Sequence, residues 1–520
     1  KVWSGRAVRR VLRLPCALFG LLRFKPASLR FASFGIIGVA GLGLSACQII
    51  DTGSALDPSA VSETGAGKKK DLFSFDALRA KDPQAKLGAK EHPAVLKANG
   101  GVYSNERLED LLAVITGSLV THSDDPTRAY NITVLNSPSV NAFALPGGYL
   151  YVTRGLLALA NDASEVAAVI SHEMAHVTAN HGIERNRKAA VQGVADRVVN
   201  DVVSNRIAGR VAQESTRRRL IAFSQRQELQ ADALGIALLG KAGFDPFAGA
   251  RFLVAMDRYG RWRSANRLSA NAMSTSHPST PKRIELARRH ARKFGPEGIG
   301  QTKRRRYLAG IEGLLWGDRS TEGFVRGRRF SHTTLGVTFE VPEGFELSNR
   351  TDAVLASGND QQALRFDTAR TAGAPASAAA YLASGWVNGL RGDTVERRTI
   401  NGMDAAFGLA QAGDWRFAIG VVKRKGYFYR FIMAAPRGSP KIAQLNRQIV
   451  QSFRALTAAE KTALRPLRLR IHTVERGETI ASVAGKMQGM ERRRDLFLVL
   501  NGLQATDRLK AGQRVKIIAE

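Results

Sequence analysis

Two kinds of hydrophobic pattern organise the first half of the chain. Segments 131–135 and 148–152 are rich in β-branched and aromatic residues and predict short strands. The unbroken apolar run 166–170 instead predicts a buried helix. Asp162 followed by Glu165 resembles the capping box that starts such a helix. We therefore expect a small sheet followed by a helix buried within the fold.

Beyond about residue 290 the pattern changes to mainly alternating, strand-like segments. The strand-like segments lie at 336–342, 363–366, 405–410, 417–422 and 427–434, and helical stretches at 376–390 and 439–455. This mixture predicts an α+β domain over 325–460. This domain contains no recognisable group of catalytic residues, so the sequence does not indicate its function.

The buried helix carries the motif His172-Glu173-Met174-Ala175-His176. Residues four apart lie on the same face of a helix, so His172 and His176 can direct two imidazoles at one zinc ion. Glu173 then lies beside the metal, where it can take a proton from the attacking water as a catalytic base. The alternative, an ordinary histidine–glutamate surface pair, needs no further partner downstream.

A further carboxylate pair follows in a second helical segment. Glu228 and Asp232 are one helical turn apart. Glu228 can complete a set of two histidines and one carboxylate, leaving the fourth zinc position open as catalysis requires. Asp232 is placed to accept the N–H of a ligand histidine and to fix its tautomer. On their own, the two acids would fit a solvated helix face equally well.

Four blocks in this order resemble a family of zinc metallopeptidases that includes the CAAX prenyl endopeptidases, the HtpX-like proteases and periplasmic relatives. The matching blocks are 141–148, the His172 motif with His181 behind it, Glu228 to Asp232, and His277-Pro278. The resemblance covers about 91–290 and implies a mainly α-helical, zincin-type domain with a small edge sheet over 91–315. The family often has arginine where this chain has Gln225, with Arg226 next to it.

The resemblance also implies roles for two further segments. In such peptidases an edge strand beside the metal binds the substrate backbone, and Val140–Leu145 is the candidate here. A plain structural hairpin is the alternative. His277 lies in a Ser- and Pro-rich loop before a helix starting near Lys282, and some relatives use such a histidine as a regulatory metal ligand. Alternatively, His277 caps or packs against that helix. His181 is expected to pack behind the ligands.

The N-terminal segment resembles a bacterial lipoprotein signal. Eight basic residues and no acid precede an uncharged stretch over 31–46, which ends in Leu-Ser-Ala before Cys47. We expect 1–47 to be a signal peptide, Cys47 to be lipidated, and 48–90 to be a flexible tether. Gln48 favours an outer-membrane destination on the periplasmic side. A single membrane-spanning anchor is the alternative, although 16 uncharged residues are short for a bilayer.

The last segment, 468–518, resembles a LysM module, a βααβ unit that binds N-acetylglucosamine polymers such as peptidoglycan. The resemblance rests on 473–484, 500–503 and 509–517. Two departures are Ala481, where an aromatic residue is common, and the basic run 492–494. Peptidoglycan binding and a purely structural cap therefore remain as two interpretations.

Composition narrows the function classes. A chain of 520 residues is long enough for about three domains, so the fold class is multidomain. The formal net charge of +32 is spread over every segment, and no nucleic-acid-binding motif accompanies it, which favours anionic envelope surfaces over nucleic acid. Both cysteines lie in the signal region, so zinc ligation must use histidine and carboxylate.

Together these features predict a zinc metalloendopeptidase of the bacterial cell envelope, holding one Zn²⁺ per chain. The expected substrates are unfolded or misassembled envelope polypeptides, with membrane attachment through the lipid on Cys47. Two other classes stay open: a non-catalytic lipoprotein that binds peptidoglycan, and a peptidoglycan hydrolase. The zinc hydrolases of the cell wall use a His-x-His element, which this sequence lacks.

Overall fold

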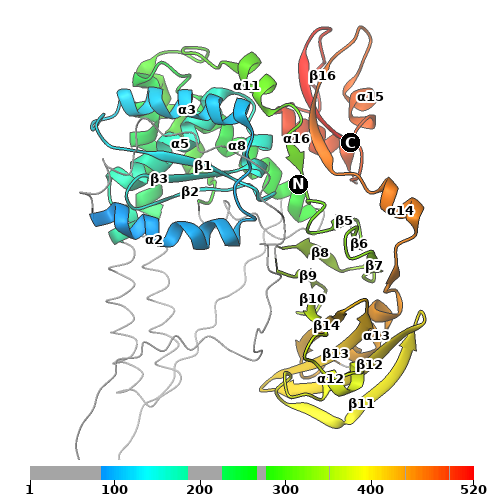
Figure 1. The fold of residues 1–520 in the computed structure, drawn as a ribbon. Helices are drawn as coiled ribbons and strands as arrows, with labels where there is room; N and C mark the ends of the chain where they lie inside the picture. The colour runs from blue at the N-terminus through cyan, green and yellow to red at the C-terminus, as the bar shows by residue number, and fades with distance from the viewer. Residues whose placement is uncertain (1–82, 185–224, 266–276, 351, 440, 491) are drawn as a thin grey trace, which may run out of the picture. The chain divides into compact units, whose positions relative to one another are not determined.

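The structure is a computed structural model that describes residues 83–184, 225–265, 277–350, 352–439, 441–490 and 492–520 (Figure 1). The predicted signal peptide, Cys47 and the tether up to residue 82 lie outside these ranges. Among the described helices, none is both long and apolar enough to cross a bilayer.

The first part of the described chain is mainly helical, as the sequence predicts. Its helices are α2 (Pro83–Ala98), α3 (Glu106–Thr121), α4 (Arg154–Leu159), α5 (Ala163–Thr178), an unlabelled helix over 225–241, α8 (Ala248–Ala265), α10 (Pro281–Ala291), η2 (Arg292–Phe294) and α11 (Arg304–Ile311). Helix α2 begins inside the segment predicted as a tether. It does so because it packs closely on the sheet: a Cβ on Gly88 would lie 2.3 Å from the carbonyl oxygen of Pro146.

A three-stranded sheet precedes the buried helix. Its strands are β1 (Asn131–Leu135), β2 (Ala142–Leu145) and β3 (Tyr149–Thr153), in the order β1-β3-β2. Strand β2 is therefore an edge strand, antiparallel to β3. Figure 1 shows α2 on one side of this sheet and α3 and α5 on the other. The tight turn between β2 and β3 uses Gly147 and Gly148, both with φ near +80°.

Helix α5 lies in the centre of this part of the fold. Every residue from Ala163 to Val177 is buried. Its neighbours include α3 and α8, and its apolar side chains belong to one continuous core with both. A helix that is surrounded by protein on all sides is rigid, so side chains on it hold fixed positions.

The predicted α+β domain contains two sheets. Its strands are β5 (Phe324–Arg326), β6 (Arg329–His332), β7 (Val337–Glu340), β8 (Glu346–Asn349), β9 (Val354–Ser357), β10 (Ala363–Arg370), β11 (Leu390–Ile400), β12 (Met403–Ala412), β13 (Trp415–Arg424), β14 (Tyr427–Pro436) and β15 (Arg454–Ala455). The larger sheet has the order β11-β12-β13-β14-β10-β9-β8, and the smaller one β15-β7-β6-β5. Helices α12 (Ala378–Leu382) and α13 (Ile442–Gln451) pack in separate apolar clusters on the larger sheet.

Helix α12 is shorter than the helical stretch predicted over 376–390. It ends at Leu382, and two glycines in the following turns, Gly385 and Gly389, have φ values of 94° and 73°. These left-handed conformations are incompatible with a continuing α-helix, whereas glycine adopts them without strain.

The C-terminal segment has the predicted βααβ order. After α14 (Ala458–Ala463) come β16 (Leu467–Thr473), α15 (Ile480–Gly485), α16 (Arg493–Asn501) and β17 (Arg514–Ala519). Strand β16 also pairs with β4 (Leu315–Trp316), a strand that the sequence analysis did not predict. The fully buried Lys516 Nζ donates to the carbonyl oxygens of Ala158, Leu159 and Ala160, at 2.9, 3.0 and 2.7 Å. Ala158 and Leu159 are the last residues of α4 and Ala160 is its C-cap, so no intrahelical donor remains for these carbonyls.

Candidate metal centre and active site

The local sequence fixes where α5 begins. The side chain of Asp162 caps the helix by accepting from the backbone N–H of Glu165, at 2.9 Å. The Glu165 carboxylate accepts from the N–H of Asn161 at 2.8 Å, one residue before the cap residue that a regular capping box would use. The helix then runs without interruption to Thr178, so His172, Glu173 and His176 all project from regular helix.

A close helix contact brings Glu228 to the same place. In the helix over 225–241, Gly235 packs against the backbone of His172, and a Cβ there would lie 3.0 Å from its nitrogen. Such a short distance between helices requires glycine. Glu228 and Asp232 are both buried and face α5, whereas Gln225 and Arg226 are exposed. Neither Gln225 nor Arg226 is therefore buried beside the two carboxylates.

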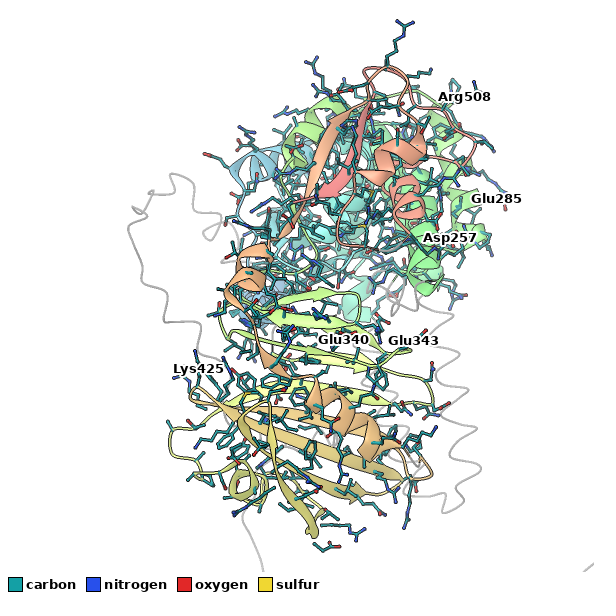
Figure 2. The ribbon with its side chains drawn as sticks, turned by 90° about the vertical axis from the view of Figure 1, so that its right-hand side faces the viewer. Asp257, Glu285, Glu340, Glu343, Lys425 and Arg508 are labelled. Carbon is teal, nitrogen blue, oxygen red and sulfur yellow. The ribbon has the colours of Figure 1, made fainter. Side chains whose placement is uncertain are left out.

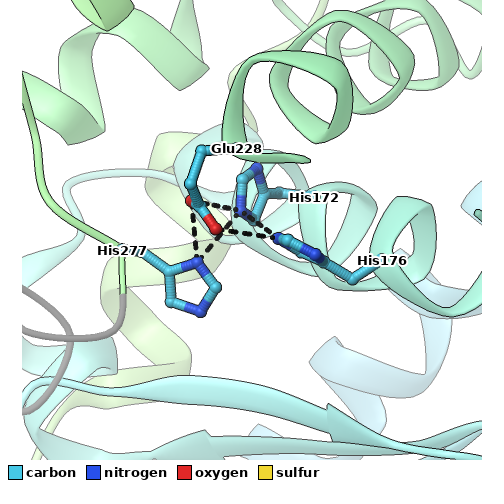
Figure 3. A group of neighbouring side chains, drawn as sticks. All are labelled: His172, His176, Glu228 and His277. Atoms are coloured by element: carbon cyan, nitrogen blue, oxygen red, sulfur yellow. Dashed lines mark hydrogen bonds and ion pairs between the residues drawn. The ribbon is translucent and has the colours of Figure 1, made fainter. Parts of the chain in front are cut away.

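The third contribution comes from the loop before α10. Thr280 caps this helix by accepting from the N–H of Arg283 at 3.2 Å, so His277 is not the helix cap. His277 is 6% exposed, which is unusual for a histidine in a short polar loop. The imidazole of His277 lies against the two histidines of α5 (Figure 3).

Four possible metal ligands therefore meet in one buried cluster (Figure 3). His172, His176, Glu228 and His277 each offer an atom, and all four atoms lie within 4.8 Å of one another. The Nε2 atoms of His172 and His176 are 3.0 Å apart, and Glu228 Oε2 lies 2.9 Å from His277 Nδ1. The His172 Nε2 atom is 3.4 Å from both Glu228 Oε2 and His277 Nδ1.

The spacing of these atoms fits zinc. Ligand atoms about 2.0–2.1 Å from a tetrahedral zinc ion are separated from each other by roughly 3.3 Å. The observed separations are close to this value. Two or three imidazoles and one carboxylate are also a ligand set that zinc prefers. The cluster can therefore hold one zinc ion, with His277 in the position that would otherwise be open.

Glu173 lies beside the cluster and is not among its four ligands. Its side chain is buried, and its Oε1 atom finds no hydrogen-bond partner within the described part of the chain. The Nε2 atom of His277 lies 3.7 Å from that oxygen, which is too far for a hydrogen bond. A buried carboxylate oxygen without a donor is costly unless something else uses it. Glu173 Oε1 is thus available to accept a proton from a molecule bound next to the metal.

Asp232 connects the cluster to an arginine that the sequence analysis did not identify. Asp232 Oδ1 lies 3.0 Å from His172 Nδ1, the contact expected for a carboxylate that orients a ligand histidine. Arg283 donates to both oxygens of Asp232 at 2.8 Å, and its Nη1 atom lies 3.0 Å from Glu228 Oε2. Arginine in the first turn of a helix opposes the helix dipole, and this was the available sequence signal for Arg283.

His181 lies behind His176, the second possible ligand on α5. Its Nδ1 atom lies 3.0 Å from His176 Nδ1, and its Nε2 atom lies 3.3 Å from Gln230 Oε1. The side chain is buried but is not part of the four-residue cluster. The expectation that His181 packs behind the ligands agrees with this position.

The electrostatic environment favours binding of a cation. Burial alone would lower the pKa of His172, but hydrogen bonds to Asp232 and Glu228 outweigh burial and raise it to about 10. Burial lowers the pKa of His176 to about 4. Burial opposes ionisation of Glu228 and Asp232 as well, yet their histidine and arginine partners lower both pKa values, that of Asp232 to about 2. Two ionised, buried carboxylates thus face the histidine nitrogens.

Comparison with known proteins agrees with this geometry. Residues 105–291 match the model of peptidase family M48. The chain is 29% identical over 201 residues to the beta-barrel assembly-enhancing protease of Escherichia coli strain K12, covering 37% of this chain and 40% of that protein. It is 32% identical over 156 residues to the mitochondrial metalloendopeptidase OMA1 of Schizosaccharomyces pombe, covering 30% of this chain and 44% of that protein.

The family match covers the part of the chain that holds the metal cluster. The chain spans about half or less of the length of the curated relatives it matches. The C-terminal part of the chain, from residue 292 on, lies outside the family match. The part over 105–291 is therefore similar to metallopeptidases, and the M48 match replaces the narrower HtpX-like resemblance.

Proposed function

We propose that this chain is a zinc-dependent metalloendopeptidase of the bacterial cell envelope that cleaves unfolded or misassembled envelope proteins. The observation that carries the proposal is the buried cluster of His172, His176 and Glu228 with the unpartnered carboxylate oxygen of Glu173 beside it. The match of this region to peptidase family M48 supports it.

Three residues of the cluster are the proposed zinc ligands, and Glu173 beside the cluster is the proposed base. His172, His176 and Glu228 would hold a zinc ion, which when bound would polarise the peptide carbonyl and increase the acidity of water. Glu173 accepts the proton that water loses as its oxygen attacks the carbonyl carbon, through the free Oε1 atom. The same carboxyl group then gives that proton to the leaving amine as the C–N bond breaks.

Two residues keep the ligands in position. Asp232 accepts from His172 Nδ1 and so leaves Nε2 of that imidazole free for the metal. Arg283 fixes Asp232 through two parallel hydrogen bonds and also contacts Glu228. Arg283 also donates to the carbonyl oxygen of Pro278, next to His277. It thereby connects the His277 loop to the ligand Glu228 and to Asp232, which orients His172.

The edge strand β2 is the proposed binding site for the substrate backbone. Among the strands of the described residues it pairs with β3 alone, and it lies against α5, which carries His172 and His176. An extended polypeptide can add to such an edge through main-chain hydrogen bonds, which any unfolded sequence can make. Most strands of a folded protein are already paired on both sides, so the proposal favours unfolded substrates.

We expect a polypeptide to be cleaved only when it is unfolded. The test compares a reduced, alkylated form of a small disulfide-bonded protein with its native form, at equal concentrations and with the zinc-loaded chain. Cleavage of the alkylated form should exceed that of the native form by at least about tenfold, because only the alkylated chain can pair with β2. Equal rates for both forms would contradict recognition by strand addition.

His277 is proposed to be a regulatory ligand that closes the site. Its Nδ1 atom faces Glu228 and His172, and its Nε2 atom faces Glu173. In this state the imidazole occupies the position that the substrate carbonyl and water require. Substrate binding must therefore displace His277 before the reaction can begin.

Replacement of His277 by alanine is expected to raise basal proteolysis several-fold while zinc remains bound. The reason is that the three remaining ligands still hold the metal and water gains the vacated position. Casein cleavage and zinc content, measured on the same preparation, check this. The control is His122→Ala, an exposed histidine at the end of α3. A His277→Ala protein that keeps its zinc but is inactive would contradict the regulatory role.

The location and partners of the chain are part of the same proposal. Lipidation of Cys47 would attach the protein to a membrane, with the outer membrane favoured by Gln48. The name of the Escherichia coli relative, which refers to assembly of beta-barrels, supports a place in the cell envelope. The βααβ segment would add contact with peptidoglycan if it binds glycan as LysM modules do. Polypeptides are the proposed substrates, and no nucleic-acid partner is proposed.

A further inference from the structure

A small cavity opens next to the metal cluster. Its volume is about 40 Å³. His172 and His277, two members of the cluster, form part of its wall, so the cavity adjoins the position of the reacting peptide bond. The remaining lining comes from α5, the helix over 225–241, α8 and α10.

The cavity continues the ligand-bearing face of α5. Ala168 and Val169 lie four and three residues before His172 and therefore on the same helix face. One helical turn advances 5.4 Å and an extended chain rises about 3.3 Å per residue, so these side chains are between one and two residue lengths of an extended substrate away from the ligand. The distance suits the side chain of a residue that adjoins the bond being cleaved.

The chemistry of the lining selects an apolar occupant. From α8 come Phe252, Leu253 and Met256, and Ile236 faces them from the helix over 225–241. Asp232 and Arg283 also reach the wall, but they neutralise each other through two 2.8 Å hydrogen bonds. The cavity therefore offers no free charge to a charged or strongly polar side chain, which would lose its hydration there.

The size of the cavity limits the occupant further. By the same measure of volume, roughly 10–15 Å³ is needed to hold a single water molecule. A volume of 40 Å³ therefore suits an aliphatic group of a few carbon atoms and is too small for an aromatic ring.

We propose that this cavity is a specificity pocket that receives a small aliphatic side chain adjoining the scissile bond. The inference rests on the proposed peptidase function. Backbone recognition at β2 alone would give little specificity for side chains. The pocket would add selection of one side chain. The preferred substrates are thus unfolded segments with a residue such as valine or leucine at the cleaved bond.

Replacement of Gly249 by alanine would fill part of the pocket with one methyl group. Gly249 lines the cavity from α8, and a Cβ added there would lie 3.5 Å from Ile236 Cγ1 and 3.9 Å from Ala168 Cβ. These are ordinary van der Waals distances, so alanine fits without a shift of the backbone. Gly260 on the same helix is a matched control, because a Cβ there would meet nothing within 4 Å.

The experiment measures the specificity of the full-length, zinc-loaded protein with a peptide library that varies both residues flanking the cleaved bond. We expect the wild type to favour leucine or valine over glycine by at least about tenfold at one of these positions, because each added methylene in an apolar pocket changes kcat/KM by about 10–200-fold. In Gly249→Ala, the preference for leucine over alanine should fall at least about tenfold. Gly260→Ala should retain the preference of the wild type.

Three results would overturn the inference: a wild type without preference at either position, a preference for a charged residue, or an unchanged preference in Gly249→Ala. These outcomes differ from failure of the proposed function itself. In that case the zinc-loaded wild type would cleave no peptide of the library at all.

Discussion

Replacement of Glu173 by glutamine is expected to abolish most proteolysis while leaving zinc bound. Glutamine keeps the shape of the side chain but cannot accept a proton, and loss of a general base costs about 10²–10⁴-fold in rate. The four ligands His172, His176, Glu228 and His277 are unchanged, so the zinc content should stay at one ion per chain. Casein cleavage and zinc analysis on the same samples measure both quantities.

The matched control is Glu285→Gln, because Glu285 is an exposed glutamate on α10 that forms only a surface ion pair with Arg289 (Figure 2). This variant should cleave casein at the rate of the wild type. A Glu173→Gln protein with nearly normal activity would mean that another group accepts the proton and that the unpartnered oxygen of Glu173 has a different use.

Loss of Glu228 is expected to empty the metal site. Glu228 supplies the only carboxylate of the cluster, and its Oε2 atom also receives contacts from His277 and Arg283. Loss of a residue that only hydrogen-bonds to a ligand lowers zinc affinity by roughly 10–100-fold. Because Glu228 is itself a ligand, the zinc affinity of Glu228→Ala should fall by more than this. Zinc retained after dialysis against a weak chelator is the quantity to measure.

Glu228→Ala also leaves the buried Arg283 with one partner fewer, so its fold must be checked separately. Glu228→Gln serves this purpose, since the amide keeps the volume of the side chain and can still accept from Arg283. Both variants should lose zinc, and Glu285→Ala should keep it. Stoichiometric zinc in a folded Glu228→Gln protein after the same dialysis would remove Glu228 from the ligand set.

Much of the candidate site was predictable because helical spacing alone determines which side chains share a face. The four-residue spacing was enough to pair His172 with His176. Glu228 and Asp232 also have this spacing, but it indicated a metal site only because the His172 motif precedes them. Arg283 was missed because its role depends on how α10 packs against the helix over 225–241, which no local pattern reveals. The specificity pocket was missed for the same reason, since four separate helices contribute to its wall.

The fold followed the sequence best where the pattern was local. Strands β7, β10, β12, β13 and β14 appear where alternation predicted them, whereas β5, β6, β8, β9, β11 and β15 were not predicted. The βααβ order of the last segment follows the resemblance that predicted it. The pairing of β4 with β16 was not predicted, because more than 100 residues separate the two strands and β4 has only two residues. The burial of Lys516 was not predicted either, because a lysine in a strand normally indicates an exposed position.

One preparation of the full-length chain can test directly whether the chain cleaves polypeptides with one zinc ion in this cluster. Zinc content, cleavage of casein and degradation of purified peptidoglycan sacculi are measured together, with and without a chelator. We predict one zinc per chain, casein cleavage that stops on chelation and returns with added zinc, and intact sacculi. A zinc-loaded protein that degrades sacculi but leaves casein intact would contradict the account.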